Sequence, residues 1–118
     1  MKDCIFCKII AGQIGAKKIG ESSNFLCIED INPQAPVHLL VMPKLHVASL
    51  DAAFPGDEPN QQKMVGELFE FAVKIARDQG LLPSGFRSVI NTHSNGGQTV
   101  FHLHLHLLGG KSLSGMFA

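Results

Sequence analysis

Three histidines alternate with leucines near the end of the chain, where His102, His104 and His106 stand in "HLHLHLL". A β-strand sends successive side chains to opposite faces, so this spacing predicts three imidazoles on one face and three leucines on the other. The leucine face is typical of a buried core. The imidazole face must therefore be hydrated, paired, bound to a metal ion or catalytic.

Two chemical uses of these histidines compete. Histidines two residues apart on a strand can chelate one metal ion. Alternatively, one imidazole acts as a nucleophile or general base while its neighbours orient it and bind an anion. The preceding "SNGGQT" favours the second use for at least one histidine. A Gly-Gly turn followed by Gln98 and Thr99 offers backbone N–H groups, an amide and a hydroxyl, which are the donors that a phosphoryl group needs.

Short elements with tight connections are expected to position these groups. A short helix in "CIFCKIIAG" closes at Gly12, a hairpin follows over residues 17–29, and the strand "VHLLVMP" ends at Pro43. One long helix is predicted over residues 61–79, with Gly80 as its C-terminal cap, because apolar residues recur there at spacings of three and four. "FRSVINT" and "TVFHLHLHLL" are predicted as the last two strands. The pattern predicts an α+β fold: a five-stranded antiparallel meander sheet with one long helix and a short N-terminal helix.

Length and charge exclude several classes of protein. The 118 residues are expected to form one domain, residues 1–118, and a chain of this size buries a core without disulfides. Lys and Arg total 10 against 10 for Asp and Glu, so no net charge attracts nucleic acid or an anionic membrane. No apolar run approaches the roughly 20 residues of a membrane span, and the charged N-terminus does not fit a secretory signal. Three cysteines favour a reducing compartment, with Cys27 in the core, so we expect a cytoplasmic protein.

The alternating histidines resemble a known sequence pattern. "HLHLHLL" matches the His-φ-His-φ-His-φ-φ motif (φ is apolar) of the histidine triad (HIT) superfamily. "CIFCKIIAG", "DINPQAPVHLLVMPKLHVASL" and "VINTHSNGGQTVFHLHLHLLGG" resemble successive blocks of its bacterial-type histidine triad nucleotide-binding (HINT-like) proteins. Only the loop over residues 54–60 and the last few residues lack such support. The resemblance implies a HIT-like fold and hydrolysis of the phosphorus–nitrogen bond of adenosine phosphoramidates.

The resemblance also implies a catalytic set of four residues. His104 corresponds to the nucleophile that attacks the α-phosphorus and becomes transiently nucleotidylated, a role that suits a neutral imidazole. His106 corresponds to a phosphate contact that helps to protonate the leaving nitrogen, and Thr99 stands near the leaving group. His102 completes the set, and His38 matches a further family histidine beside the triad.

Recognition of a purine nucleotide of the AMP or GMP type is implied in the same way. Asp30 matches the carboxylate that accepts both ribose hydroxyls, while Asn91 and Gln98 match phosphate or ribose contacts. The base pocket is expected to use apolar side chains, for most of which simple core packing remains an equal alternative: Ile31, Phe6, Ile9 and Leu40.

Two cysteines raise a separate question. Cys4 and Cys7 form a C-x-x-C pair, for which two buried free thiols remain an alternative. With His46 and His102 they make a Cys2His2 set, the composition of a closed structural zinc site. Zinc-bearing relatives of the superfamily use the first triad histidine in this way, so we expect structural zinc and no organic cofactor. His93 is an alternative to His102 as the fourth ligand.

Three functions remain open at this point. The first is the nucleoside phosphoramidase, which "HLLGG" and the short tail favour. The second is a dinucleoside polyphosphate hydrolase, which shares the nucleophile and differs in the leaving group. The third is a zinc-stabilised nucleotide-binding interaction protein.

A homodimer is expected in each case. The family pairs two sheets edge to edge, and an open five-stranded sheet leaves backbone donors at its edges that must be covered. Phe69 and Phe71 lie off the main apolar stripe of the predicted long helix, which indicates a second buried face.

Overall fold

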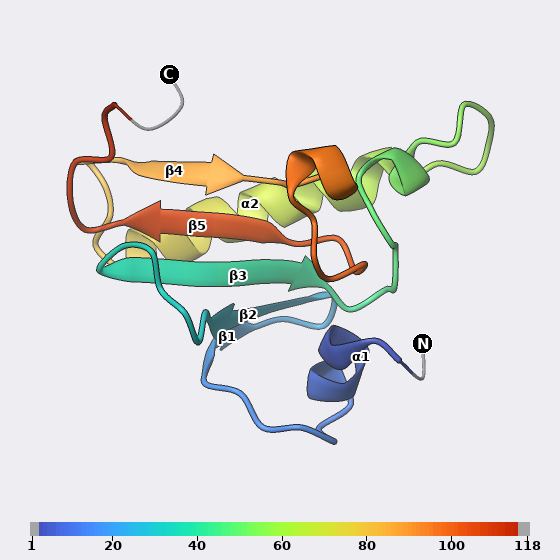
Figure 1. The fold of residues 1–118 in the computed structure, drawn as a ribbon, viewed down its shortest axis with the longest axis horizontal. Coiled ribbons are helices and arrows are strands. Elements are labelled where there is room, and N and C mark those ends of the chain that lie inside the picture. The colour runs from blue at the N-terminus through green and yellow to red at the C-terminus, as the bar shows by residue number, and fades with distance from the viewer. Residues whose placement is uncertain (1–2, 116–118) are drawn as a thin grey trace.

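The computed structural model describes residues 3–115, and its helices and strands follow one another closely (Figure 1). Residues 1–2 and 116–118 of the expected domain lie outside the described residues. In chain order the elements are α1 (Ile5–Ile10), β1 (Lys18–Glu21), β2 (Phe25–Glu29), β3 (Val37–Pro43), η1 (Asp51–Ala53), α2 (Gln62–Asp78), β4 (Phe86–Val89), η2 (Ser94–Gly96) and β5 (Leu105–Gly109).

The five strands form one antiparallel sheet in the order β1-β2-β3-β5-β4. The predicted α+β fold, with one long helix and a short N-terminal helix, is confirmed. The order differs from that of a simple meander in one respect, because β5 lies between β3 and β4. The histidine-bearing strand is therefore interior, and His106 faces Leu40 of β3 on one side and Val89 of β4 on the other.

The two faces of β5 are both covered, and this decides the environment of the histidines. In Figure 1 α2 crosses behind the sheet, and Leu103, Leu105 and Leu107 belong to the core that it buries. On the opposite face, α1 places Phe6 and Ile9 against a second cluster formed with residues of β2 and β3. The leucine face is core, as predicted. The imidazole face is also covered, since His102 is fully buried and His104 is 7% exposed.

The last strand is shorter than the sequence predicts. It begins at Leu105 rather than at Thr99, because the preceding residues hydrogen-bond to the last residue of β3 through a side chain and to the loop after β3, outside the strand ladder. The Leu103 N–H donates to the Val47 carbonyl at 2.7 Å. The His102 ring nitrogen Nε2 donates to the Pro43 carbonyl, also at 2.7 Å. At the end of β3, the His102 side chain thus supplies the hydrogen bond that the backbone of a neighbouring strand would otherwise donate.

Two further features bear on what the fold can do. No helix within residues 3–115 has the length and apolar character needed to cross a membrane.

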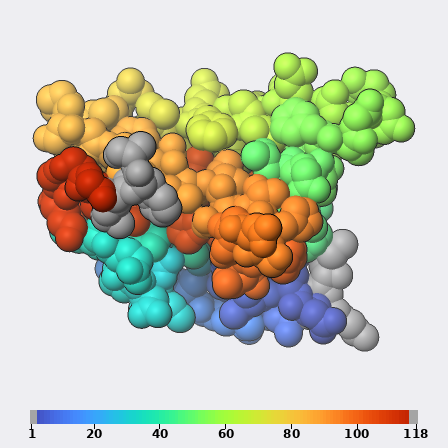
Figure 2. Space-filling model, turned by 45° about the horizontal axis from the view of Figure 1, so that its top comes forward, coloured from blue at the N-terminus to red at the C-terminus, as the bar shows by residue number. Residues whose placement is uncertain are grey.

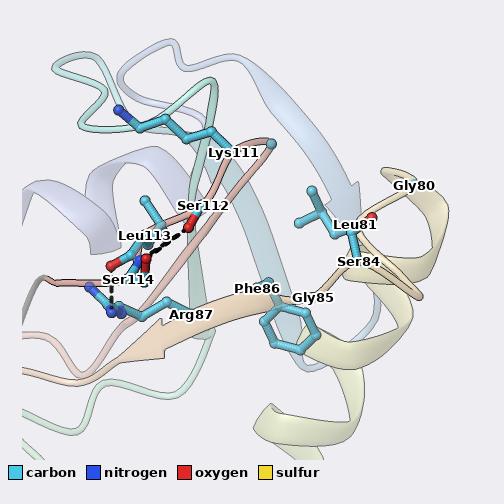
Figure 3. A pocket seen from close by; sticks show the side chains of 11 residues that line it. Gly80, Leu81, Ser84, Gly85, Phe86, Arg87, Lys111, Ser112, Leu113 and Ser114 are labelled. Carbon is cyan, nitrogen blue, oxygen red and sulfur yellow. Dashed lines mark hydrogen bonds between the residues drawn. The ribbon is translucent and has the colours of Figure 1, made fainter. Parts of the chain in front are cut away.

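A cavity of about 820 Å³ lies between the turn after α2 and the segment after β5, beside Arg87 and Lys111 (Figure 3). The Arg87 guanidinium donates to the Leu113 carbonyl at 2.9 Å within it. None of the residues expected at the functional site lines this cavity.

Candidate functional site

His104 is held in one orientation and one tautomer. Its Nδ1–H donates to the His102 carbonyl at 2.7 Å, which leaves the lone pair of the ring on Nε2. The Phe6 ring meets the imidazole edge-on, with 5.0 Å between the ring centres. Burial lowers the pKa of His104, although its bond to the His102 carbonyl and the charge of Asp30 oppose the shift. A buried, neutral imidazole with a free lone pair can act as a nucleophile.

A second imidazole pair lies beside the first. The Gln34 backbone N–H donates to Nδ1 of His38 at 3.0 Å, so the proton of a neutral His38 ring is on Nε2. That Nε2 lies 3.0 Å from Nδ1 of His106 and 3.3 Å from the Asp30 carboxylate. His106 accepts at Nδ1 in this arrangement, and its own proton is on Nε2. Burial and the neighbouring His104 and His38 lower the pKa of His106 to about 4.

Asp30, His38 and His106 lie close enough to share a metal ion. The hydrogen bond from Gln34 argues against that use, because a ring whose Nδ1 accepts a hydrogen bond carries its proton on Nε2. A protonated nitrogen cannot ligate a metal. The group is instead a hydrogen-bonded line from the turn after Asp30 to His106.

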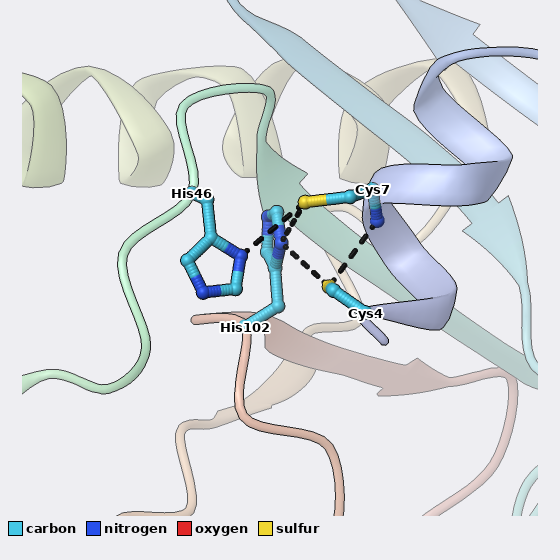
Figure 4. A group of neighbouring side chains, drawn as sticks. All are labelled: Cys4, Cys7, His46 and His102. Atoms are coloured by element: carbon cyan, nitrogen blue, oxygen red, sulfur yellow. Dashed lines mark hydrogen bonds between the residues drawn. The ribbon is translucent and has the colours of Figure 1, made fainter. Parts of the chain in front are cut away.

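The predicted Cys2His2 set is brought together from three parts of the chain (Figure 4). Cys4 is the N-cap residue of α1 and Cys7 lies within that helix, while His46 comes from the loop after β3 and His102 from the segment before β5. The four ligand atoms lie within 4.8 Å of one another. Nδ1 of His102 is 3.4 Å from Sγ of Cys4 and 3.6 Å from Sγ of Cys7, which lies 3.3 Å from Nδ1 of His46.

These distances fit a tetrahedral zinc ion. Ligand distances of about 2.3 Å to sulfur and 2.0–2.1 Å to nitrogen place sulfur and nitrogen about 3.6 Å apart at the corners of a tetrahedron. The His102 ring also has its other nitrogen bound to the Pro43 carbonyl, as ligating imidazoles usually do. Cys27 is fully buried outside this group, and burial raises its pKa to about 12, so it belongs to the core as predicted.

The loop before the triad is built around Gln98, which is 6% exposed. Its Nε2 donates to the carbonyls of Ala48 at 2.8 Å and Val100 at 3.1 Å. Both amide hydrogens are thus used within the chain and shape the loop, and the expected contact with a nucleotide remains a prediction. Asn91 also braces the loop, since its Nδ2 donates to the Gly96 carbonyl at 2.6 Å. The Thr99 side chain is exposed.

The residues expected around the base divide into two groups. Phe6, Ile9 and Leu40 are buried in the second cluster, and the Phe6 ring also contacts His102 and His104. Phe6 therefore combines core packing with contact to the triad. Ile31, by contrast, is fully exposed on the turn that follows Asp30.

His93 lies apart from the cysteines. The four-residue group contains His102, so His93 is not its fourth ligand. Nε2 of His93 lies instead 2.9 Å from Oδ1 of Asp51, which accepts a 2.5 Å hydrogen bond from the Ser49 hydroxyl. This contact could not be predicted from the sequence, because residues 42 positions apart carry no recognisable spacing.

Comparison with known proteins gives consistent results. The family model described as "Scavenger mRNA decapping enzyme C-term binding" matches residues 3–117. Protein HitA of Neisseria gonorrhoeae is 45% identical over 109 residues, which cover 92% of this chain and 97% of that protein. A HIT family hydrolase from Legionella pneumophila Philadelphia 1 has a TM-score of 0.89 at 40% identity, over 97% of this chain and 98% of that one. A histidine triad protein from Clostridium difficile has a TM-score of 0.89 at 42% identity, over 96% and 95%. The similarity extends over nearly the whole chain in both sequence and structure.

Proposed function

The chain belongs to the histidine triad superfamily, and on that premise we propose that it is a purine nucleotide-binding hydrolase that cleaves the phosphorus–nitrogen bond of adenosine 5′-phosphoramidates. The observation that carries this proposal is the hydrogen bond from Nδ1 of His104 to the His102 carbonyl, which leaves Nε2 as the nucleophilic nitrogen. The hydrolase names of similar structures support the reaction class.

The reaction divides into two steps. Nε2 of His104 attacks the α-phosphorus, a phosphorus–nitrogen bond to the imidazole forms, and the bond to the leaving amine breaks. Water then attacks the nucleotidyl-histidine, which releases the nucleotide and restores the neutral imidazole. Because both chemical steps exchange one bond at phosphorus, no oxidant or reductant is needed.

His106 assists the departure of the amine. The free site keeps its imidazole neutral, because burial and two neighbouring imidazoles lower its pKa to about 4. A bound phosphate carries negative charge, and an opposite charge nearby favours the protonated form of an imidazole. Substrate binding thus prepares His106 to protonate the leaving nitrogen, while His38 fixes the orientation of the ring.

Nucleotide recognition uses Asp30, at the opposite end from His106 of the hydrogen-bonded residues Asp30, His38 and His106. The Asp30 carboxylate, next to His38, accepts the ribose hydroxyls, and Phe6 contributes an apolar edge beside His104. Cys4, Cys7, His46 and His102 would hold a zinc ion, which would supply structural support rather than chemistry, because Nε2 of His104 lies outside this group.

Steady-state kinetics on two substrates tests the proposal. Adenosine 5′-phosphoramidate and a diadenosine polyphosphate are measured side by side, with the His104→Ala protein as the control for contaminating activity. We expect a clearly higher kcat/KM for the phosphoramidate. A preference for the polyphosphate would replace the proposal by the polyphosphate hydrolase. Nucleotide binding without turnover of either substrate would favour the interaction protein.

A further inference from the structure

The backbone of His93 has a conformation that is unusual for any residue with a side chain. Its φ is 58° and its ψ is −173°, a region that is occupied almost only by glycine. The chain uses glycine at Gly97, where φ is 81°, only four residues later. A histidine persists in such a conformation only when its surroundings hold it there, and such residues concentrate at functional sites.

The side chain supplies one of the contacts that hold it. Nε2 of His93 lies 2.9 Å from Oδ1 of Asp51, and the Ser49 hydroxyl donates to the same oxygen at 2.5 Å. Both hydrogen bonds lower the pKa of Asp51, and the bond from Ser49 has the larger effect. The carboxylate is therefore ionised. Ser49 is 2% exposed, so its hydroxyl ties this pair, whose own side chains are more than half exposed, to a buried residue.

Backbone groups of His93 make the other contacts that hold its conformation. Its N–H donates to Oε1 of Gln98 at 2.9 Å, and its carbonyl accepts the Gln98 N–H at 3.0 Å and the Gly96 N–H at 3.2 Å. Gln98 in turn donates to the Ala48 carbonyl at 2.8 Å. We use "His93 clamp" for Ser49, Asp51, His93 and Gln98. The clamp closes the loop on itself and ties it to residues 48–51.

The clamped loop leads directly to the triad. Gln98 donates to the Val100 carbonyl at 3.1 Å, and the Val100 side chain packs on the cluster that contains Phe6. The Phe6 ring contacts His104 at 5.0 Å between ring centres. Figure 2 shows the segment around η2, in orange, next to the green segment of η1, which are the two parts that His93 and Asp51 connect.

We propose that His93 is a positioning residue, which through Asp51 holds the loop of residues 94–99 where that loop receives the phosphoryl group of a nucleotide at His104. The inference rests on the proposed function. The imidazole does not touch the reacting atoms. It fixes a loop that ends at the exposed Thr99, whose hydroxyl is the donor offered to the phosphate, while the N–H groups of Gly96, Gly97 and Gln98 hold the loop itself together.

The test compares binding of AMP with binding of adenosine, which differ only in the phosphate. His93→Gly removes the imidazole and leaves a residue that adopts this backbone freely, so the fold is retained. We expect its affinity for AMP to fall about tenfold while its affinity for adenosine changes less than twofold, and kcat/KM to fall with the AMP affinity. Asp51→Ala should give the same loss, and the double variant should lose no more than either single one.

Two further variants make the result specific. His93→Gln keeps an N–H donor near the position of Nε2 and should restore most of the AMP affinity. Glu21→Gln removes the ion pairs that Glu21, on the edge strand β1, makes with Lys18 and Lys44, and should change neither ligand's affinity.

The outcomes separate the two levels of inference. Unchanged AMP affinity in His93→Gly, or an equal loss for AMP and adenosine, would overturn the positioning role while leaving the hydrolase proposal intact. Wild-type protein that binds AMP no better than adenosine would count against both. Amide exchange at Gln98, expected to be at least tenfold faster in His93→Gly, measures the clamp itself without any ligand.

Discussion

The location of single protons decides what the imidazoles of this site can do. The Gln34 N–H fixes the proton of His38 on Nε2, and the His102 carbonyl fixes the proton of His104 on Nδ1. Adjacent imidazoles therefore present opposite chemistry: His104 offers a lone pair and His106 offers an N–H. A nucleophile and a donor to the leaving group need this pair of functions.

Replacement of His104 is the most direct test at the scale of one residue. His104→Ala should lose hydrolysis by several orders of magnitude, because no other group with a free lone pair lies at that position, while nucleotide binding through Asp30 is retained. Rapid quenching followed by mass spectrometry should find a nucleotidyl adduct on His104 of the wild type. An adduct on His102 or His106 would contradict the assignment.

Asp30 is expected to act mainly on binding. Its Oδ1 accepts the Asn32 N–H at 2.8 Å, so the carboxylate is already fixed before the ribose arrives. Asp30→Asn should raise KM by about 10-fold with a smaller effect on kcat, since hydrogen bonds to a charged group contribute roughly 1.5–3 kcal/mol and persist through the reaction. Removal of the 2′-hydroxyl from the substrate should raise KM little further in the Asp30→Asn variant. Undiminished discrimination between ribose and deoxyribose would show that another residue binds the sugar.

His106 should also make the stability of the protein depend on pH. Folding lowers its pKa from 6.5 to about 4, so between these values the unfolded chain binds more protons than the folded one. The free energy of unfolding should therefore fall as the pH drops from about 6.5 towards 4, with a contribution from His106 on the order of 2 kcal/mol. His106→Asn should flatten this dependence in urea unfolding at pH 7 and pH 4.5. An equal slope in both proteins would contradict the lowered pKa.

At the scale of elements, periodicity predicted most of the fold. The apolar spacing that predicts a helix over residues 61–79 corresponds to α2 at Gln62–Asp78, and the alternation in "HLHLHLL" correctly separates the leucine face from the imidazole face. The start of β5 could not be predicted in this way. Residues 99–104 keep a strand-like alternation, but their partners are Pro43 and Val47, and such contacts between distant loops leave no period in the sequence.

The candidate site was predictable to a similar extent. The C-x-x-C pair made a metal site one of two interpretations, and the family resemblance indicated His102 as a ligand, with His93 as the alternative; the structure brings Cys4, Cys7, His46 and His102 together. The partners of Gln98 and the contact between His93 and Asp51 could not be foreseen, since they depend on how two irregular loops pack. Residue type predicts chemistry well, whereas the supporting hydrogen bonds require the structure.

The helix α1 is the element that we expect to depend most on the proposed metal. It has six residues, too short to be stable alone, and both Cys4 and Cys7 belong to the proposed zinc site. The purified protein should contain about one zinc ion per chain. Cys4→Ser, or removal of the ion by a strong chelator, should lower the melting temperature by roughly 10 °C, as expected for a loss of a few kcal/mol.

The control for the metal prediction is the third cysteine. Cys27→Ser alters a buried thiol in β2 and should leave the zinc content unchanged. Activity in Cys4→Ser should fall only as the fold loosens, because His104 is outside the ligand set. If protein purified without any chelator contains no zinc, and Cys4→Ser has the melting temperature of the wild type, the zinc site would be contradicted. Cys4 and Cys7 would then be two buried thiols, the alternative interpretation.

At the scale of the whole molecule, β5 and the residues just before it connect the core with the candidate site. β5 is interior in the sheet, Leu105 and Leu107 lie in the core beside α2, and His104, just before the strand, packs against Phe6 of α1. The proposed zinc site, the nucleophile and the clamp all connect to the residues just before this strand. A disturbance of the core near Leu105 should therefore reach all three.

The arrangement of α2 indicates where a second copy of the chain would bind. Phe71 stacks on Phe25 with 5.6 Å between ring centres and packs partly buried against the core of its own chain, contrary to the expectation that it belongs to a second face. Phe69 is 42% exposed. At about 100° per residue, Phe69 lies on the opposite side of the buried stripe from Phe71 and Lys74, which border the turn between β1 and β2. Phe69 thus faces the side of the sheet where β4 forms an edge.

We therefore expect a homodimer that covers the β4 edge and Phe69 together, because an open strand edge and an exposed aromatic ring are both stabilised by burial. Sedimentation at micromolar concentration should give twice the chain mass of 12.7 kDa. Phe69→Glu should shift the equilibrium towards the monomer by at least tenfold, whereas Lys74→Glu, on the opposite side of the same helix, should leave it unchanged. A wild-type mass near 12.7 kDa, or equal effects of the two variants, would contradict this interface.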